Sequence, residues 1–106
     1  MAVDTVPASA GSKKANRYEF RCKPGGTVYS VPKVQYLSGE GSDFIEEAIK
    51  ADMTEITLTR RLLMIECPEA ADEIRAMAGD QIMFISRRWA EASNITPGES
   101  EGSENS

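Results

Sequence analysis

Adjacent carboxylates are the first residues in this chain that have the chemistry of a catalytic acid or base. They occur as two pairs, Glu46-Glu47 and Asp72-Glu73. Acid–base catalysis needs carboxyl groups that converge in a cleft, where the pKa of one is shifted away from the other. Neighbouring residues on a helix point about 100° apart. Each pair is therefore expected to form a solvated helix face and not a catalytic pair.

The 106-residue chain has no histidine and only two cysteines, Cys22 and Cys67. Without histidine it lacks the usual general base and the Ser-His and Cys-His nucleophile pairs. Two widely separated cysteines are too few for a zinc site, which takes about four ligands. We therefore expect no catalytic residue, no metal and no cofactor. Both cysteines are expected to be free thiols in a reducing cytosol.

Two arginine pairs, Arg60-Arg61 and Arg87-Arg88, have the charge to hold phosphate groups. Such pairs more often cover the outer face of an amphipathic helix. The segment Pro24-Gly25-Gly26 does not resemble a phosphate-binding loop, because no Lys-Ser/Thr pair follows it and no helix opens after it. The arginine pairs are therefore expected to be surface charge.

Charge is distributed unevenly along the chain. Residues 1–33 carry six Lys and Arg against two acids, a charge of +4, whereas residues 34–106 carry −9. The basic residues near the N-terminus that could contact nucleic acid are Lys13, Lys14, Arg17, Arg21 and Lys23. On a chain with a net charge of −5 and no recognition motif, they are better explained as the solvated face of a strand.

A β-hairpin is the clearest structural prediction. Residues 17–23 alternate strictly, with Tyr18 and Phe20 on one face, as in a half-buried strand. Residues 24–26 predict a tight turn, because proline presets the first turn position and glycine accepts positive φ at the next. Residues 27–31 then return as the second strand. Two strands alone are barely stable in water, so the aromatic face needs cover from the helices or from another chain.

Helices are expected after the hairpin. Residues 32–42 are interpreted as a linker, and Ser42 or Asp43 as the cap of a helix that runs through Ala51. Residues 54–59 are ambiguous, because they alternate as a strand would. The apolar face that follows them favours a helix capped by Thr54 instead.

Two further helices are predicted before the chain ends. Pro68 suits the first turn of a helix that runs through Met77. Gly79 is expected to end that helix and Asp80 to cap the last one. The last helix would bury a stripe of apolar residues at helical spacing: Ile82, Ile85, Trp89 and Ala92.

The order of elements predicts an α+β domain, an N-terminal β-hairpin followed by three to four short helices. This domain is placed at residues 17–95. A disordered arm over residues 1–16 and a disordered acidic tail over residues 96–106 are expected to flank it, because both carry too little apolar surface to offset the entropy of ordering them. Nothing approaches the roughly 20 apolar residues of a membrane helix. A domain this small often gains stability by association, so a homo-oligomer is expected.

The single tryptophan, Trp89, has two plausible roles. It can fill the core from the last helix. It can also anchor a partner, since tryptophan is enriched where partners bind. Both roles stay open on the sequence.

The order of segments resembles the tail assembly chaperones of long-tailed, siphovirus-type phages that infect actinobacteria. The resemblance covers residues 17–100 and rests on a polar arm, Tyr18-Glu-Phe20, and Thr27-Val-Tyr-Ser-Val-Pro32. It continues through short helices to the segment Asp80-Gln-Ile-Met-Phe-Ile-Ser-Arg-Arg-Trp89 and a Gly-Glu-Ser tail. Proteins of this family are small and acidic, with a short β element, a helical body and a tryptophan helix near the end.

The resemblance implies a non-enzymatic chaperone in the host cytoplasm. Such a protein binds the long helical tape-measure protein and helps recruit tail tube subunits. The family also implies a ribosomal frameshift near the end of the gene, and Pro97-Gly98-Glu99 is where a slippery run could lie. The residues expected in the core or in contact with the partner are Trp89, Ile85, Phe84, Tyr18 and Phe20.

Two other functions compete with the chaperone. The first is a small nucleic-acid-binding regulator that uses the basic N-terminal hairpin. The second is an oligomeric phage structural subunit, such as a head–tail or tube component, that uses the edge of the hairpin. We expect no membrane partner and rank nucleic acid below a protein partner.

Overall fold

The regular structure opens with an antiparallel hairpin of strands β1 (Arg17–Arg21) and β2 (Val28–Pro32). It is seen in a computed structural model that describes residues 2–94. The turn has Pro24 at its second position and Gly25 at its third, where φ is +74°. Positive φ at that position is the requirement of a type II turn, which glycine meets without strain. The predicted hairpin and its turn are confirmed.

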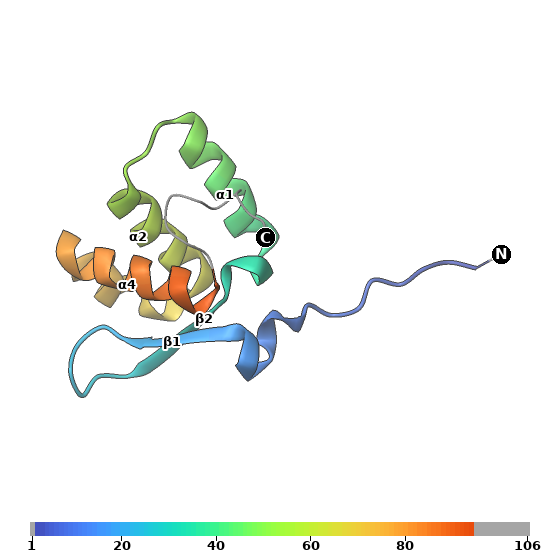
Figure 1. Ribbon diagram of the computed structural model, residues 1–106, viewed down its shortest axis with the longest axis horizontal. Helices are drawn as coiled ribbons and strands as arrows, with labels where there is room; N and C mark the ends of the chain where they lie inside the picture. The colour runs from blue at the N-terminus through green and yellow to red at the C-terminus, as the bar shows by residue number, and fades with distance from the viewer. Residues whose placement is uncertain (1, 95–106) are drawn as a thin grey trace.

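Four α-helices follow within the described residues: α1 (Gly39–Lys50), α2 (Glu55–Glu66), α3 (Ala71–Ala76) and α4 (Gly79–Ala92). Short 3-10 turns lie at Ala10–Ser12, Lys14–Asn16, Val34–Tyr36 and Pro68–Ala70. Figure 1 shows α4 alongside the hairpin, and α1 on the opposite side of the molecule from it, with α2 between. The α+β class predicted from the sequence is confirmed.

The ambiguous segment over residues 54–59 belongs to helix α2. Its cap is Thr54, whose Oγ1 accepts a hydrogen bond from the Thr57 amide at 3.3 Å. A capping side chain satisfies one of the free amides of a first helical turn. The alternation of threonines with apolar residues in this segment therefore occurs at the start of a helix and does not indicate a strand.

The start of α1 differs from the prediction. The helix begins at Gly39, and the predicted cap at Ser42 or Asp43 is wrong because Ser38 caps it. The Ser38 Oγ accepts from the Gly41 amide at 3.0 Å and donates to the Glu66 carboxylate at 2.7 Å. The glycines that suggested a flexible linker are instead the first turn of the helix. Gly41 is buried there, where a Cβ would collide with the Glu66 carboxylate.

The junction of α3 and α4 also differs from the prediction. Gly79 does not end a helix but is the first residue of α4, and Asp80 lies within the first turn. The N-cap is Ala78, whose amide donates to the Gln81 Oε1 at 2.7 Å. The Gln81 side chain in the first turn therefore accepts from the amide of the residue that precedes the helix, in place of the expected cap by Asp80.

Residues 10–16 form two 3-10 turns against the domain. Gly11 is buried beside Tyr36, and its carbonyl accepts a hydrogen bond from the Arg17 guanidinium at 2.9 Å. The preceding residues extend away from the domain (Figure 1). Ordered contacts thus begin before residue 17, while the mobility of the arm stays a prediction. The predicted tail over residues 96–106 lies outside the described residues.

The core lies where the aromatic face of the hairpin meets the helices. Phe20 stacks beside Tyr18, with ring centroids 5.9 Å apart, and is 6% exposed. Helices of the same chain therefore supply the cover that this face requires. The buried core cluster contains Phe20, Val31, Leu62, Leu63, Cys67, Ala70, Ile74, Met77, Ile82, Ile85 and Trp89.

Helix α4 is tied to the chain that leaves the hairpin. The Trp89 Nε1 donates a hydrogen bond to the Pro32 carbonyl at 2.9 Å. One turn later, the buried Ser93 Oγ accepts from the Val34 amide at 2.9 Å, and its carbonyl accepts from the Gln35 side-chain amide at 2.9 Å. Buried polar groups are costly unless they are paired. These three bonds satisfy them while they hold the end of α4 against the end of β2.

We predict that Trp89→Ala lowers the free energy of unfolding by about 3–5 kcal/mol, because it removes a buried ring and leaves the Pro32 carbonyl unpaired. Urea unfolding followed by circular dichroism measures this change. The matched control is Arg87→Ala, at an exposed position of the same helix with no hydrogen bond or ion pair among the described residues, which should shift stability by at most about 0.5 kcal/mol. A Trp89→Ala protein as stable as wild type would contradict the core assignment.

Candidate partner-binding site

The five side chains expected in the core or at a partner lie in three environments. Trp89 and Ile85 are each 3% exposed and Phe20 is 6% exposed, so all three belong to the core. Tyr18 is half-buried at its edge. Phe84 is 61% exposed. Of these five side chains, Phe84 is therefore the one that is exposed enough for a partner to contact over most of its surface.

Phe84 lies on the flank of α4, between its buried and solvated sides. The Arg88 guanidinium lies over the ring, 5.9 Å from its centroid. A cation over an aromatic face stabilises by about 0.5–1 kcal/mol at an exposed site. A single exposed apolar residue is common on protein surfaces. Phe84 becomes a candidate because of the cavity that it borders.

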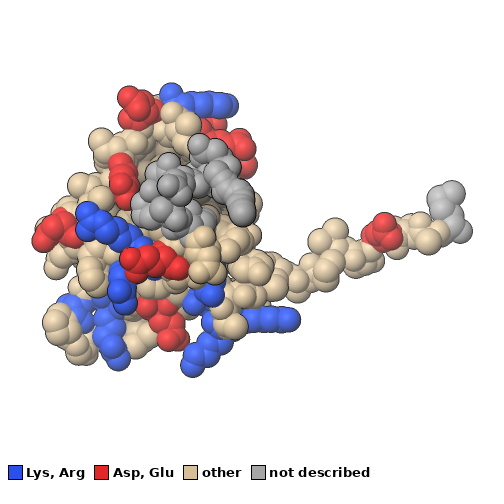
Figure 2. Space-filling model, viewed as in Figure 1, with Lys and Arg blue, Asp and Glu red and all other residues tan. Residues whose placement is uncertain are grey.

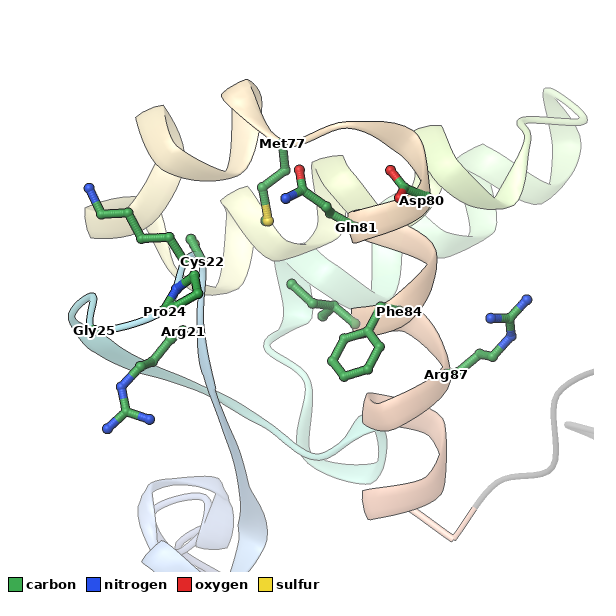
Figure 3. Close-up of a pocket in the computed structure, with 11 residues that line it drawn as sticks. Arg21, Cys22, Pro24, Gly25, Met77, Asp80, Gln81, Phe84 and Arg87 are labelled. Atoms are coloured by element: carbon green, nitrogen blue, oxygen red, sulfur yellow. The ribbon is translucent and has the colours of Figure 1, made fainter.

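A cavity of about 560 Å³ lies between the hairpin turn and α4. Its apolar wall contains Cys22, Pro24, Met77, Phe84 and Ile85, and its polar wall contains Arg21, Lys23, Gly25, Asp80, Gln81 and Arg87. In Figure 3, Phe84 extends from α4 on the side of the hairpin, whereas Arg21 and Arg87 extend outward at opposite edges. We call this cavity the Phe84 groove.

A smaller cavity of about 260 Å³ continues the groove toward α3. It shares Cys22, Lys23, Met77 and Gln81 with the first cavity and adds Glu73 and Ala76. The Glu73 Oε2 accepts a hydrogen bond from the Tyr29 hydroxyl at 2.7 Å, while its Oε1 is buried without a partner among the described residues. The inner end of the groove therefore carries a carboxylate.

Two ionisable groups near the groove, Tyr29 and Cys22, have raised pKa values. The hydrogen bond to Glu73 raises the pKa of Tyr29, and burial, with a smaller effect of Glu73, raises the pKa of Cys22. In the core, burial followed by the charge of Glu69 raises the pKa of Cys67 to about 11. A reactive cysteine needs a lowered pKa. Both thiols are therefore protonated at neutral pH.

The basic residues near the N-terminus do not form one patch. Lys13 and Lys14 lie in the 3-10 turns that precede β1, whereas Arg21 and Lys23 lie at the turn end of the hairpin. A five-residue strand separates the two groups by roughly 15 Å. Arg17 between them is a structural residue, because its guanidinium donates to the Ser30 Oγ at 2.8 Å and to the Ser30 carbonyl at 3.0 Å.

Two residues that the sequence placed on solvated faces have structural roles. Arg60 donates to the carbonyls of Ile74, Arg75 and Met77 at 3.0, 3.1 and 2.7 Å, so it caps the end of α3. Glu73 bonds Tyr29, although its neighbour Asp72 and the pair Glu46-Glu47 are exposed as expected. Neither role has a signal in the local pattern, because both depend on segments distant in sequence.

Basic residues predominate in one part of the visible face of the molecule, although acidic residues lie among them. Figure 2 shows Lys and Arg gathered over the hairpin and the adjoining part of α4, while Asp and Glu are more frequent toward α1. The basic side of the Phe84 groove belongs to the first region. Long-range attraction would therefore favour an acidic partner at this end of the domain.

Within residues 2–94, no cluster of three or more Cys, Asp or Glu side chains is arranged to hold a metal ion. Over the same residues, no helix has the length and apolar character to cross a membrane. No protein family, curated protein or solved structure matches this chain.

We predict opposite outcomes for two neighbouring residues of α4. Ile85→Ala should cost about 2–5 kcal/mol of stability, because it opens a cavity in the core. Phe84→Ala should cost no more than about 1 kcal/mol, since the ring is largely solvated and loses mainly its contact with Arg88. Thermal melts of the two variants compare them directly. Equal destabilisation by both would show that Phe84 is part of the core.

Proposed function

We propose that this protein is a non-enzymatic binding protein, a phage tail assembly chaperone that acts in the host cytoplasm. It covers helical segments of the tape-measure protein and helps recruit tail tube subunits. The observation that carries the proposal is the exposed Phe84 ring at the edge of the Phe84 groove. The identity of the partner comes from the resemblance to the chaperone family.

The size of the groove suits transient binding of a helix. About 560 Å³ accommodates a few side chains, and not a whole helix. Burying one large apolar side chain contributes about 1.5–3 kcal/mol. A single site of this kind binds weakly, so a long partner is covered by many copies that leave easily. A chaperone must release its client when the tube forms, and weak sites allow that release.

The first alternative has less support from the observed geometry. A nucleic-acid-binding regulator would use the basic residues of the hairpin, which are split between its two ends, with Arg17 engaged in structural hydrogen bonds. An oligomeric structural subunit would use the strand edges left open in the two-stranded sheet of the described residues. Self-association through those edges stays a prediction.

Co-expression with the tape-measure protein tests the proposal. Wild type should co-purify with it and keep it in solution, whereas Phe84→Ala should lose most of the bound partner while it stays folded. The matched control is Ile49→Ala, because Ile49 is 69% exposed but lies on α1, away from the groove. A tape-measure protein that co-purifies equally with wild type and Phe84→Ala would contradict the proposal.

A further inference from the structure

We infer that the Phe84 groove recognises one kind of helix, an amphipathic helix with acidic residues one turn from its apolar anchor. The inference rests on the proposed function in treating the groove as a partner site and the partner as a helix. It adds the charge that the partner must carry there. It also specifies the position on the partner helix, opposite Asp80, at which an acidic residue is excluded.

Three cations at the groove are available to a partner. Arg21, Lys23 and Arg87 line it and are exposed. The ion pairs among the described residues are Arg75–Asp72 and Arg88–Glu91, so none of the three is neutralised by a carboxylate. Arg21 uses its Nε to donate to the Gly26 carbonyl at 3.2 Å, which holds the side chain at the hairpin turn and leaves its terminal nitrogens free.

Two carboxylates set a limit on the partner. Asp80 is exposed at the N-terminal end of α4, and Glu73 lies at the inner end of the groove with one unpaired buried oxygen. A nucleic acid carries a charge on every phosphate and would bring some of them against these groups. A peptide can place acids at the basic edges alone. The mixed charge therefore favours a peptide over a nucleic acid.

The spacing along α4 defines the pattern on the partner. Asp80, Phe84 and Arg87 stand at i, i+4 and i+7, so they follow one side of the helix. Phe84 and Arg87 are separated by about 4.5 Å along the axis, and Asp80 and Arg87 by about 10.5 Å. A helix beside α4 would meet Arg87 with an acid three or four residues from its apolar anchor. It would meet Asp80 with a neutral or basic residue.

A second copy of this chain fits the groove less well. Its α4 could lie antiparallel with Asp80 opposite Arg87, but the groove has three cations against Asp80 at its outer rim. Two such rims would repel each other. An acidic partner neutralises them instead.

The test measures binding of three labelled helical peptides to the full chain by fluorescence anisotropy. The peptides share one apolar stripe and carry Glu, Gln or Lys three and four residues from its central Leu. The Glu peptide should bind about tenfold tighter than the Gln peptide, and the Lys peptide weakest. Raising the salt concentration should reduce the difference, since exposed charges are screened.

A charge-reversed chain supplies the matched comparison. The triple variant Arg21→Glu, Lys23→Glu and Arg87→Glu should bind the Glu peptide about tenfold more weakly than wild type and prefer the Lys peptide. The control triple Lys13→Glu, Lys14→Glu and Lys50→Glu has the same net charge but lies outside the groove. It should bind within about twofold of wild type.

Each contrary result has a defined meaning. Equal affinity for the Glu and Gln peptides, or no binding of any peptide, overturns the inference, and the proposed function still stands if Phe84→Ala loses the tape-measure protein. Tighter binding of a single-stranded DNA 12-mer than of the Glu peptide also overturns it. So does a dimer in sedimentation that the groove triple dissociates and the control triple does not. Glu-peptide preference without a Phe84 effect on the tape-measure protein supports the inference alone.

Discussion

The hydrogen bond from Trp89 to the Pro32 carbonyl joins the last helix to the last residue of the hairpin. The ring fills the space between α4 and the sheet, and its N–H satisfies a carbonyl at the end of β2. Ser93 extends the same attachment to the next residues of the chain. Because Trp89 and Ser93 are both bonded to this segment of the chain, they fix the rotation of α4 about its own axis. That rotation decides which side chains of α4 reach the core and which reach solvent.

The Phe84 groove follows from the same constraint. Because Trp89 and Ile85 point inward, Phe84 comes out on the flank that faces the hairpin turn. The type II turn then brings Arg21 and Lys23 to the opposite edge. The groove is formed by one helix and one turn that the core already holds in place. Its apolar wall continues into the core, so the core that stabilises the domain also supports the proposed binding surface.

The sequence predicts features that depend on local pattern and misses those that depend on distant partners. Alternation gives the hairpin, and the Pro-Gly pair gives its turn. The glycine-rich start of α1 was misassigned because the Glu66 side chain that supports the Ser38 cap lies 28 residues away. For the site, helical spacing puts Ile85 on the buried stripe and leaves Phe84 off it, but it does not show that the hairpin turn packs beside Phe84 to form the groove.

Site-specific photocrosslinking tests the central claim most directly, which is that α4 binds the partner at Phe84. Benzoylphenylalanine at position 84, irradiated in cells that also express the tape-measure protein, should give a covalent adduct with it. The same group at position 49, on the exposed side of α1, should give little or none. Crosslinks to the tape-measure protein from position 49 and none from position 84 would contradict the account.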